Sequence, residues 1–561
     1  MENREFVVFG LLVAVAGLVL LAGWLKVPYP VMLVIGGLGL GFVPGVPEVE
    51  LAPELVLLAF LPPLLYSAAF FSSLRDLRAN LRPISFLSIG LVLATTFGVA
   101  AVAHELIDGM SWSVAFVLGA IVSPTDPVAA TAIARRVGIP RRIVAVIEGE
   151  ALINDATALV AYRFALAAVA TGAFSLWEAG LQFLLSALGG VVLGLAVGWV
   201  VAAVRRRLDD PPVEITISLF TPYAAYLPAE ELGLSGVLAA VTVGIYLGWR
   251  APELITPSTR IQAYSLWEIL VFLLNSMLFV LVGLQLPAVL EGLSGGAALG
   301  LVGNGLLVSA VVIVIRVLWV FMFTYMPRFI SKGLRERDPL PPWQWTLLVG
   351  WNGMRGAVSL AAALAVPLAI AERDVILFLV FSVILCTLVL QGLTLPPLVR
   401  ALGVEDDDSE EQEEVRARLE TAEAAIARIE ELSDEDWVHD ETAERMRGLY
   451  DYRRRRFAAR AEGPDGDGDG FEQRSATYQR LRAELLSAER GALVALRGRG
   501  HISDEVMRRV ERDLDLEESR LEGPSRSSST VTVARPHAKM IEDARAVLQR
   551  GPATPLGGGD G

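Results

Sequence analysis

The residues best suited to chemistry lie between Ser123 and Asp155, in the stretch SPTDPVAATAIARRVGIPRRIVAVIEGEALIND. Carboxylates and prolines occur here inside segments that are otherwise apolar enough to span a bilayer. An ionisable side chain at that depth is costly, so it marks an ion or proton pathway by default. This stretch is therefore the first candidate for a functional site.

The first half of the stretch contains Thr125 and Asp126 between two prolines, Pro124 and Pro127. Each proline removes a backbone donor and clashes with the preceding turn, so the helix should open around Thr125. Opened backbone is tolerated inside a membrane only where protein or a water-filled cavity covers it, and its carbonyls can then bind a cation. The competing interpretation is a proline kink with a capping aspartate, but an aspartate between the prolines favours an ion site.

The second half carries Glu148, Glu150, Asn154 and Asp155. At a rise of about 1.5 Å per residue, Asp155 lies about 18 Å from the start of its helix and Asp126 about 12 Å from the end of its own. Both can therefore reach the middle of the bilayer. Judged by their positions around the helix alone, Glu148 and Glu150 are equal candidates for assisting Asp155. The competing interpretation is a buried polar cluster with a purely structural role.

Two arginines, Arg316 and Arg355, also fall inside apolar segments. A lone buried guanidinium is prohibitively costly, so we expect each to pair with a buried carboxylate, and Glu150 is the natural partner. Three glycines between residues 350 and 356 predict a second interrupted helix. The two interrupted helices would run in opposite directions, as in an inverted repeat with a midplane site. Arg163 is a further charge for which the sequence suggests no partner.

The elements that must position these residues are transmembrane helices. The chain has 561 residues, 53% of them hydrophobic, and a mean hydropathy of +0.51. These values and the long apolar runs predict an all-α polytopic membrane protein with about 13 transmembrane helices. The spans are expected near residues 5–25, 28–43, 52–71, 83–104, 112–134, 143–171, 175–203, 213–229, 232–249, 266–287, 297–326, 343–370 and 374–398.

The charges of the connecting loops predict the orientation. With these spans, one set of alternate loops holds 17 lysines and arginines and the other holds one, Arg373. Positive loops stay in the cytoplasm, so the N-terminus is expected outside and the C-terminal tail inside. The preference for arginine over lysine suggests a GC-rich prokaryotic genome, and hence a multi-pass protein of the cell (plasma) membrane.

The composition changes abruptly after Leu402. Residues 401–561 hold 37 acidic and 25 basic side chains, which is a net charge of −12 out of −14 for the chain. No basic patch suggests a nucleic-acid partner. Helical patterns run over 415–461 and 471–521, and the last residues resemble disordered sequence. We therefore predict a membrane domain over 1–402, an acidic helical cytoplasmic region over 403–525 that regulates or oligomerises, and a largely disordered tail over 526–561.

Five motifs, in order and spacing, resemble the sodium/proton exchanger family of the monovalent cation:proton antiporter superfamily, which includes prokaryotic Na+/H+ antiporters. They are TDPVA at 125–129, GEALIND at 149–155, the intramembrane Arg316, GMRGAVSLA at 353–361 and LVLQGLTLPPLV at 388–399. The resemblance covers about residues 5–400. It implies a homodimer in which a scaffold domain forms the interface. A core domain with two crossed unwound helices is then implied to move like an elevator.

The resemblance also implies roles for individual residues. Asp155 would bind the cation or the proton, and Asn154 would accompany electroneutral exchange. Thr125 and Asp126 would complete the Na+ site beside Asp155. The supporting glutamate of the family falls on Glu150 rather than Glu148, and its arginine partner falls on Arg316 or Arg355, with Arg316 favoured.

Two departures from the family's pattern concern cation selectivity. Ser67 stands where an acidic residue is common after FLPPLLY, and Ala151 stands where serine is common after the glutamate. Ser67 and Glu148 are therefore accessory candidates only. The coupling cation is expected to be Na+ or Li+, with K+ as the alternative within the same fold.

A carboxylate in a low-dielectric cavity can bind either a proton or a hard cation, and alternating access then gives antiport. The alternative from another class is a cation-binding sensor or a channel, but a channel would need a continuous polar stripe through several spans. An enzyme is least expected, because the four histidines lie outside the membrane core and no nucleophile, phosphate-binding or metal motif occurs among the expected spans. No cofactor is expected.

Overall fold

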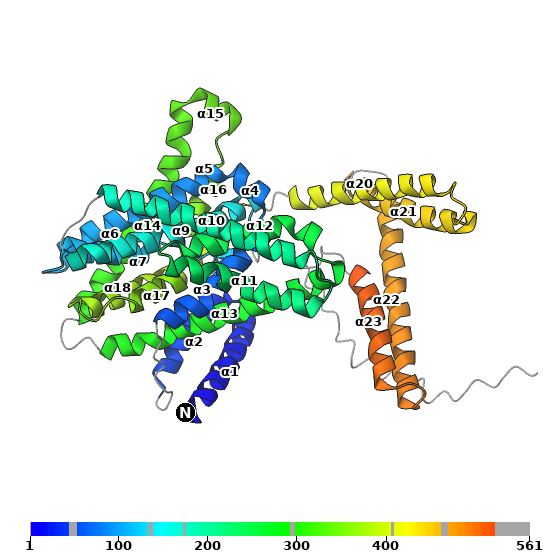
Figure 1. Cartoon of the computed structure of the whole chain (residues 1–561), viewed down its shortest axis with the longest axis horizontal. Coiled ribbons are helices and arrows are strands. Elements are labelled where there is room, and N and C mark those ends of the chain that lie inside the picture. The colour runs from blue at the N-terminus through cyan, green and yellow to red at the C-terminus, as the bar shows by residue number, and fades with distance from the viewer. Residues whose placement is uncertain are drawn as a thin grey trace, which may run out of the picture. The chain divides into compact units, whose positions relative to one another are not determined.

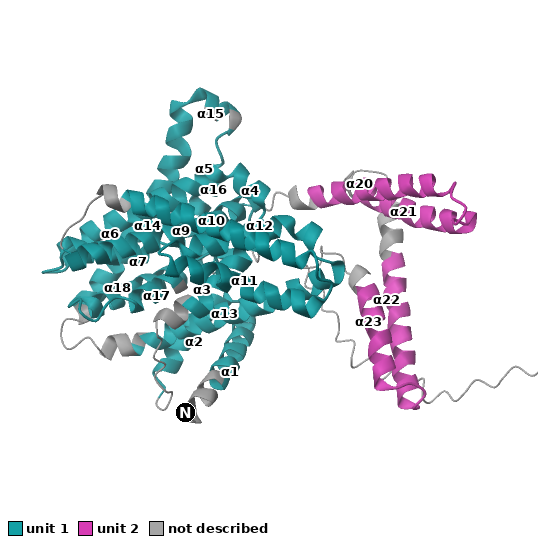
Figure 2. Ribbon diagram, viewed as in Figure 1, with its two compact units in different colours: residues 1–407 teal, residues 408–561 magenta. Residues whose placement is uncertain are grey.

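The computed structural model describes residues 2–43, 53–128, 130, 131, 133, 138–171, 176–291, 298–404, 409–461 and 469–521. Every regular element within these ranges is a helix. The chain divides into two compact units, Met1–Asp407 and Asp408–Gly561 (Figure 2). The sequence placed the membrane domain's end at 402, and Leu402 and Val404 still pack on the apolar core of the first unit.

Each of the thirteen segments expected from the sequence overlaps helical residues of the first unit (Figure 1). Five of the described helices are long and apolar enough to cross a membrane on those criteria alone, and several shorter apolar helices accompany them. The exact number of spans stays a prediction. The helices of this unit are α1 (Glu2–Leu25), α2 (Tyr29–Gly41), α3 (Pro53–Phe71), α4 (Leu74–Ala79), α5 (Leu81–Ser85), α6 (Val92–Leu106), α7 (Trp112–Val122), α9 (Arg141–Thr171), α10 (Leu176–Arg205), α11 (Pro211–Glu231), α12 (Gly236–Leu254), α13 (Pro257–Glu291), α14 (Ala298–Ile330), α15 (Lys332–Arg337), α16 (Trp343–Trp351), α17 (Ala357–Leu364), α18 (Arg373–Cys386) and α19 (Gly392–Ala401), with π-helical turns η1 (Phe86–Leu91) and η2 (Thr387–Gln391).

Two helices are interrupted where the sequence predicts it. α7 ends at Val122, residues 124–126 are not helical, and helical backbone resumes at Pro127. Likewise, residues 352–356 separate α16 from α17. The two interruptions meet, because the backbone N–H of Asp126 donates a hydrogen bond of 2.8 Å to the carbonyl of Met354. The expected crossing of two unwound helices is therefore present.

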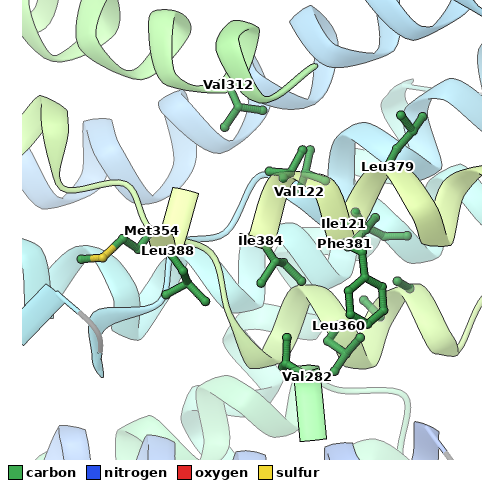
Figure 3. Packing of buried hydrophobic residues seen from close by; sticks show 14 of the residues in the cluster. Ile121, Val122, Val282, Val312, Met354, Leu360, Leu379, Phe381, Ile384 and Leu388 are labelled. Carbon is green, nitrogen blue, oxygen red and sulfur yellow. The ribbon is translucent and has the colours of Figure 1, made fainter. Parts of the chain in front are cut away.

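Apolar packing surrounds this crossing. Figure 3 shows Val122 of α7, Leu360 of α17 and Ile384 of α18 among the side chains that fill the space beside it. All three are almost completely buried. Because tightly packed apolar side chains cannot bind water, the unwound backbone is shielded and its polar groups must find partners within the protein.

Close helix contacts elsewhere in the unit depend on small residues. α2 and α13 approach so closely at Gly37 and Gly283 that a Cβ on either glycine would overlap backbone atoms of the other helix. Small residues that let helix backbones approach are typical of packing within membranes. This packing holds the backbones of α2 and α13 close together.

The second unit consists of two helical hairpins. α20 (Ser409–Leu432) and α21 (Asp440–Ala461) form the first, and α22 (Asp469–Gly498) and α23 (Asp504–Leu521) form the second. The two hairpins overlap the helical stretches expected at 415–461 and 471–521, and their first helices begin six and two residues earlier than expected. A turn divides each stretch into two helices. Gly500, with φ of 71°, lies in the turn of the second hairpin. The tail expected to be disordered, residues 526–561, lies outside the described residues.

Candidate functional site

A buried hydrogen-bonded chain links the first interruption to α9. The Asn154 side-chain amide donates to the Thr125 hydroxyl at 2.8 Å, and that hydroxyl donates to a carboxylate oxygen of Glu150 at 3.0 Å. All three residues are buried. Glu150 and Asn154 are one helical turn apart on the same face of α9, so a single threonine from the opened segment can contact both. The proline-induced opening is what places Thr125 there.

Glu150 forms a bidentate ion pair with Arg316 of α14. The two nitrogen–oxygen distances are 2.5 and 2.8 Å, and both side chains are at most 2% exposed. Arg316 also donates to the backbone carbonyl of Val349 at 3.1 Å. Arg316 is the arginine that the sequence favours for this pairing. The charge of Glu150 is therefore compensated by a fixed cation of the protein.

The expectation that Arg355 also pairs with a carboxylate is wrong. Among the described residues no carboxylate forms an ion pair with it. Its guanidinium instead donates to the carbonyl of Val122, at 3.0 Å, and to the carbonyl of Gly353. Helix ends leave carbonyls without an intrahelical partner. The two interruptions supply such carbonyls beside Arg355, so backbone dipoles take the place of a counter-ion.

Asp155 differs from Glu150 in having no ion-pair partner among the residues that the structure describes. It is 5% exposed, and within the described part of the chain no group donates a hydrogen bond to its carboxylate or forms an ion pair with it. The carboxylate of the half-buried Asp126 is near enough for the two charges to interact. Asp155 is thus a buried carboxylate whose charge no cation among the described residues compensates directly.

Asp126 itself has two structural constraints. Its carboxylate accepts a hydrogen bond from the backbone N–H of Val128 at 2.8 Å. This is the capping contact expected if the segment were only a proline kink with a capping aspartate. It also lies against Gly356 of the second interruption, where a Cβ would overlap the carboxylate. The absence of a side chain at Gly356 therefore leaves room for a carboxylate at the crossing.

The accessory candidates Ser67 and Glu148 belong to α3 and α9. Ser67 of α3 is buried, and its hydroxyl donates to the carbonyl of Leu64 in its own helix at 2.9 Å. Glu148 is half-buried, two residues before Glu150. Ala151 is buried on α9.

Sequence reasoning missed several polar groups. Asn352 and Gln391 are buried, and their side-chain amides have no hydrogen-bond partner among the described residues. Both stand within or beside the motifs GMRGAVSLA and LVLQGLTLPPLV, so their positions could have been noted. Arg163, which had no predicted partner, forms an ion pair with Glu230 of α11.

The comparison with protein families decides the identity of this arrangement. The profile described as sodium/hydrogen exchanger, transmembrane, matches residues 10–401. The chain belongs to the sodium/hydrogen exchanger family. The resemblance carried by the five motifs is thereby confirmed.

Relatives of this exchanger extend over most of its length. An uncharacterized Na+/H+ exchanger of Mycobacterium tuberculosis is 37% identical over 539 residues, which is 93% of this chain and 98% of that protein. The Na+/H+ antiporter ApNhaP of Aphanothece halophytica is 34% identical and covers 76% of this chain, with 81% of its own length matched. Both relatives are transporters by name. Cation/proton exchange is therefore the function class of this exchanger.

A solved structure shows the same fold. The sodium proton antiporter MjNhaP1 of Methanocaldococcus jannaschii superposes with a TM-score of 0.56 at 21% identity, covering 72% of this chain and 99% of that one. This confirms the all-α multi-pass membrane fold with two crossed interrupted helices.

Proposed function

We propose that this exchanger carries Na+ in one direction and H+ in the other, with Asp155 binding the two ions in turn. One observation carries the proposal: Asp155 is buried without a counter-ion from the described residues, whereas Glu150 beside it is neutralised by Arg316. A buried charge without a partner is costly. A proton or a hard cation removes that cost, but both cannot occupy the carboxylate together. Competition at one carboxylate is sufficient for antiport.

The ligands of the cation are oxygen atoms of the crossing. Asp155, Asp126 and Thr125 supply two carboxylates and a hydroxyl or carbonyl, which are the ligands that hard cations prefer. Asn154 positions Thr125 through its hydrogen bond. Arg316 already pairs with Glu150, so Glu150 takes no part in the exchange. One proton is exchanged for one monovalent cation at Asp155, and the cycle is therefore electroneutral.

The remaining parts of the proposal concern movement and placement. The core that bears the crossing moves like an elevator against a scaffold that forms a homodimer. The membrane domain spans residues 1–402 in the plasma membrane, with the N-terminus outside. Residues 403–525 form a cytoplasmic regulatory or oligomerising region, and 526–561 form a disordered tail. The loop charges support this orientation.

The test is proton efflux from acid-inside proteoliposomes on addition of Na+, Li+ or K+. Asp155→Asn should abolish exchange, and the matched control Asp374→Asn, at a side chain that is 60% exposed, should retain it. Cation-driven proton movement persisting in Asp155→Asn would refute the assignment. Exchange driven by K+ alone would leave Asp155 as the assigned site but would identify K+ as the coupling cation. A rate that responds to an imposed membrane potential would overturn electroneutrality.

A further inference from the structure

A cavity of about 100 Å3 lies between α5, η1, α9, α14 and α16. These elements surround the ends of the helices at the arginine-rich side of the first unit, which is cytoplasmic in the proposed orientation. The apolar part of the lining, which we call the base, includes Phe86, Val146 and Trp345. The charged part, which we call the wall, includes Arg82, Arg142, Arg328 and Asp338. The cavity thus combines an apolar base with a cationic wall.

The charges of that wall are unequally compensated. Asp338 forms ion pairs with both Arg142, at 3.0 Å, and Arg328. One aspartate holds two arginines in place, and the three arginines and one aspartate leave a net charge of +2 on the lining. The guanidinium carbon of Arg82 lies over the ring of Phe86, 5.8 Å from the ring centroid, and no carboxylate among the described residues forms an ion pair with this arginine.

Arg82 has an unmet hydrogen-bonding requirement. Its Nη1 atom is buried and has no acceptor among the described residues. A buried donor without an acceptor is costly, and a charged acceptor gives the strongest compensation. An anion with several oxygens could accept from Arg82 and meet the remaining positive charge of the wall.

We propose that this cavity binds a phosphate group whose attached chain or ring lies on the apolar base. Arginine recognises phosphate through its planar set of donors. Basic pockets between transmembrane helices on the cytoplasmic side bind anionic headgroups. The phosphate could belong to an anionic lipid of the cytoplasmic leaflet or to a soluble phosphate compound. Only the choice of leaflet depends on the proposed orientation, and the binding itself does not depend on the exchange mechanism.

The cavity also reaches the supporting charges of the ion site. Val349 lines it, and the carbonyl of Val349 accepts a hydrogen bond from Arg316 at 3.1 Å. Val146 lines it one helical turn before Glu150. An occupant that shifts α16 or α9 would therefore act on the Arg316–Glu150 pair, so the bound phosphate is in a position to regulate exchange.

The experiment measures the thermal unfolding of the purified full-length exchanger in detergent with three probes. These are short-chain phosphatidylglycerol, short-chain phosphatidylcholine and inorganic phosphate. Phosphatidylglycerol should raise the unfolding temperature more than phosphatidylcholine, because the choline cation of phosphatidylcholine balances its phosphate charge and is repelled by the positive lining. Arg82→Gln should weaken the effect roughly tenfold or more in ligand concentration, because a charge-assisted hydrogen bond is lost. The matched control is Arg78→Gln, an exposed arginine that does not line the cavity, and it should behave as wild type.

A second variant keeps the test decisive if Arg82→Gln fails to fold. Thr324→Phe fills the cavity and leaves every arginine in place, so it should also abolish the shift. A shift with inorganic phosphate as large as that with the lipid would assign the site to a soluble phosphate compound. Equal shifts with phosphatidylcholine and phosphatidylglycerol, or a wild-type response in both variants, would overturn the proposal.

Discussion

The ion pair between Glu150 and Arg316 gives the sharpest prediction, because its two charges lie together beneath the ion site. We consider Arg316→Met, which keeps the apolar stem and removes the charge, and Glu150→Gln, which keeps the shape and an acceptor for Thr125. The double variant removes both charges. If the pair is needed for stability, each single change should be severe and the double change should be milder than their sum.

The structure sets the magnitude. Arg316→Met removes two hydrogen bonds to the carboxylate, at 2.5 and 2.8 Å, and both side chains are at most 2% exposed. Breaking a buried pair by removing one partner costs about 3–5 kcal/mol, whereas replacing both charges is often close to neutral. A loss of that size lowers the folded-to-unfolded ratio by roughly a hundredfold or more. Glu150 left alone can take up a proton, but an isolated guanidinium cannot lose one.

The assay is thermal unfolding of the purified variants, together with the yield of folded protein in the membrane. Both single variants should unfold at lower temperature than the double variant. Arg316→Met should recover at acidic pH, and Glu150→Gln should not. The control is Arg400→Met, at an exposed position of α19, which should match wild type. Additive effects of the two substitutions, or normal stability of Arg316→Met, would refute the reasoning.

Two further predictions follow from the same structure. Gly356→Ala would place a Cβ in the position of the Asp126 carboxylate, so we expect a loss of about 1–3 kcal/mol and reduced Na+-driven proton efflux. Gly39→Ala, where the Cβ meets open space, should leave efflux unchanged, and equal efflux in the two variants would contradict this explanation. Arg163→Gln breaks the ion pair with Glu230, but the arginine side chain is 50% exposed, so the loss should not exceed about 1 kcal/mol after solvent screening. Unfolding temperatures that fall as far as those of Arg316→Met would show that this pair matters more than its exposure indicates.

The sequence was informative where local chemistry decides the structure. The interruption at Thr125 follows from two flanking prolines, and the one between Asn352 and Gly356 follows from clustered glycines. Both effects act within a few residues. The sequence also restricted the partner of Glu150 to two arginines, Arg316 and Arg355, because few charges enter the apolar segments and a buried carboxylate requires a cation. The choice between these two arginines needed the structure.

The remaining features depend on segments that are distant in the sequence. The partners of Arg355 are carbonyls, which every residue carries, so no residue type could mark them in advance. Arg163 and Glu230 are 67 residues apart, and only the tertiary fold brings these two positions on α9 and α11 within reach of each other. The cavity lined by Arg82 draws on five elements between residues 80 and 349. No motif with fixed spacing can reveal such a site.

The charges at the crossing bear on the stoichiometry of exchange, that is, on the number of protons exchanged for each cation. Three carboxylates, those of Asp126, Glu150 and Asp155, lie there with two guanidiniums, those of Arg316 and Arg355, whose charges interact with each other and with Glu150. With every group ionised the crossing carries −1, so one monovalent cation or one proton brings it to zero. In the proposed elevator cycle, the moving core is then neutral in both loaded states. A neutral core does no work against the membrane potential, whereas each uncompensated charge would cost about 2.3 kcal/mol per 100 mV. The positive charge of Arg355 is therefore needed for a neutral core, even though none of the described carboxylates forms an ion pair with it.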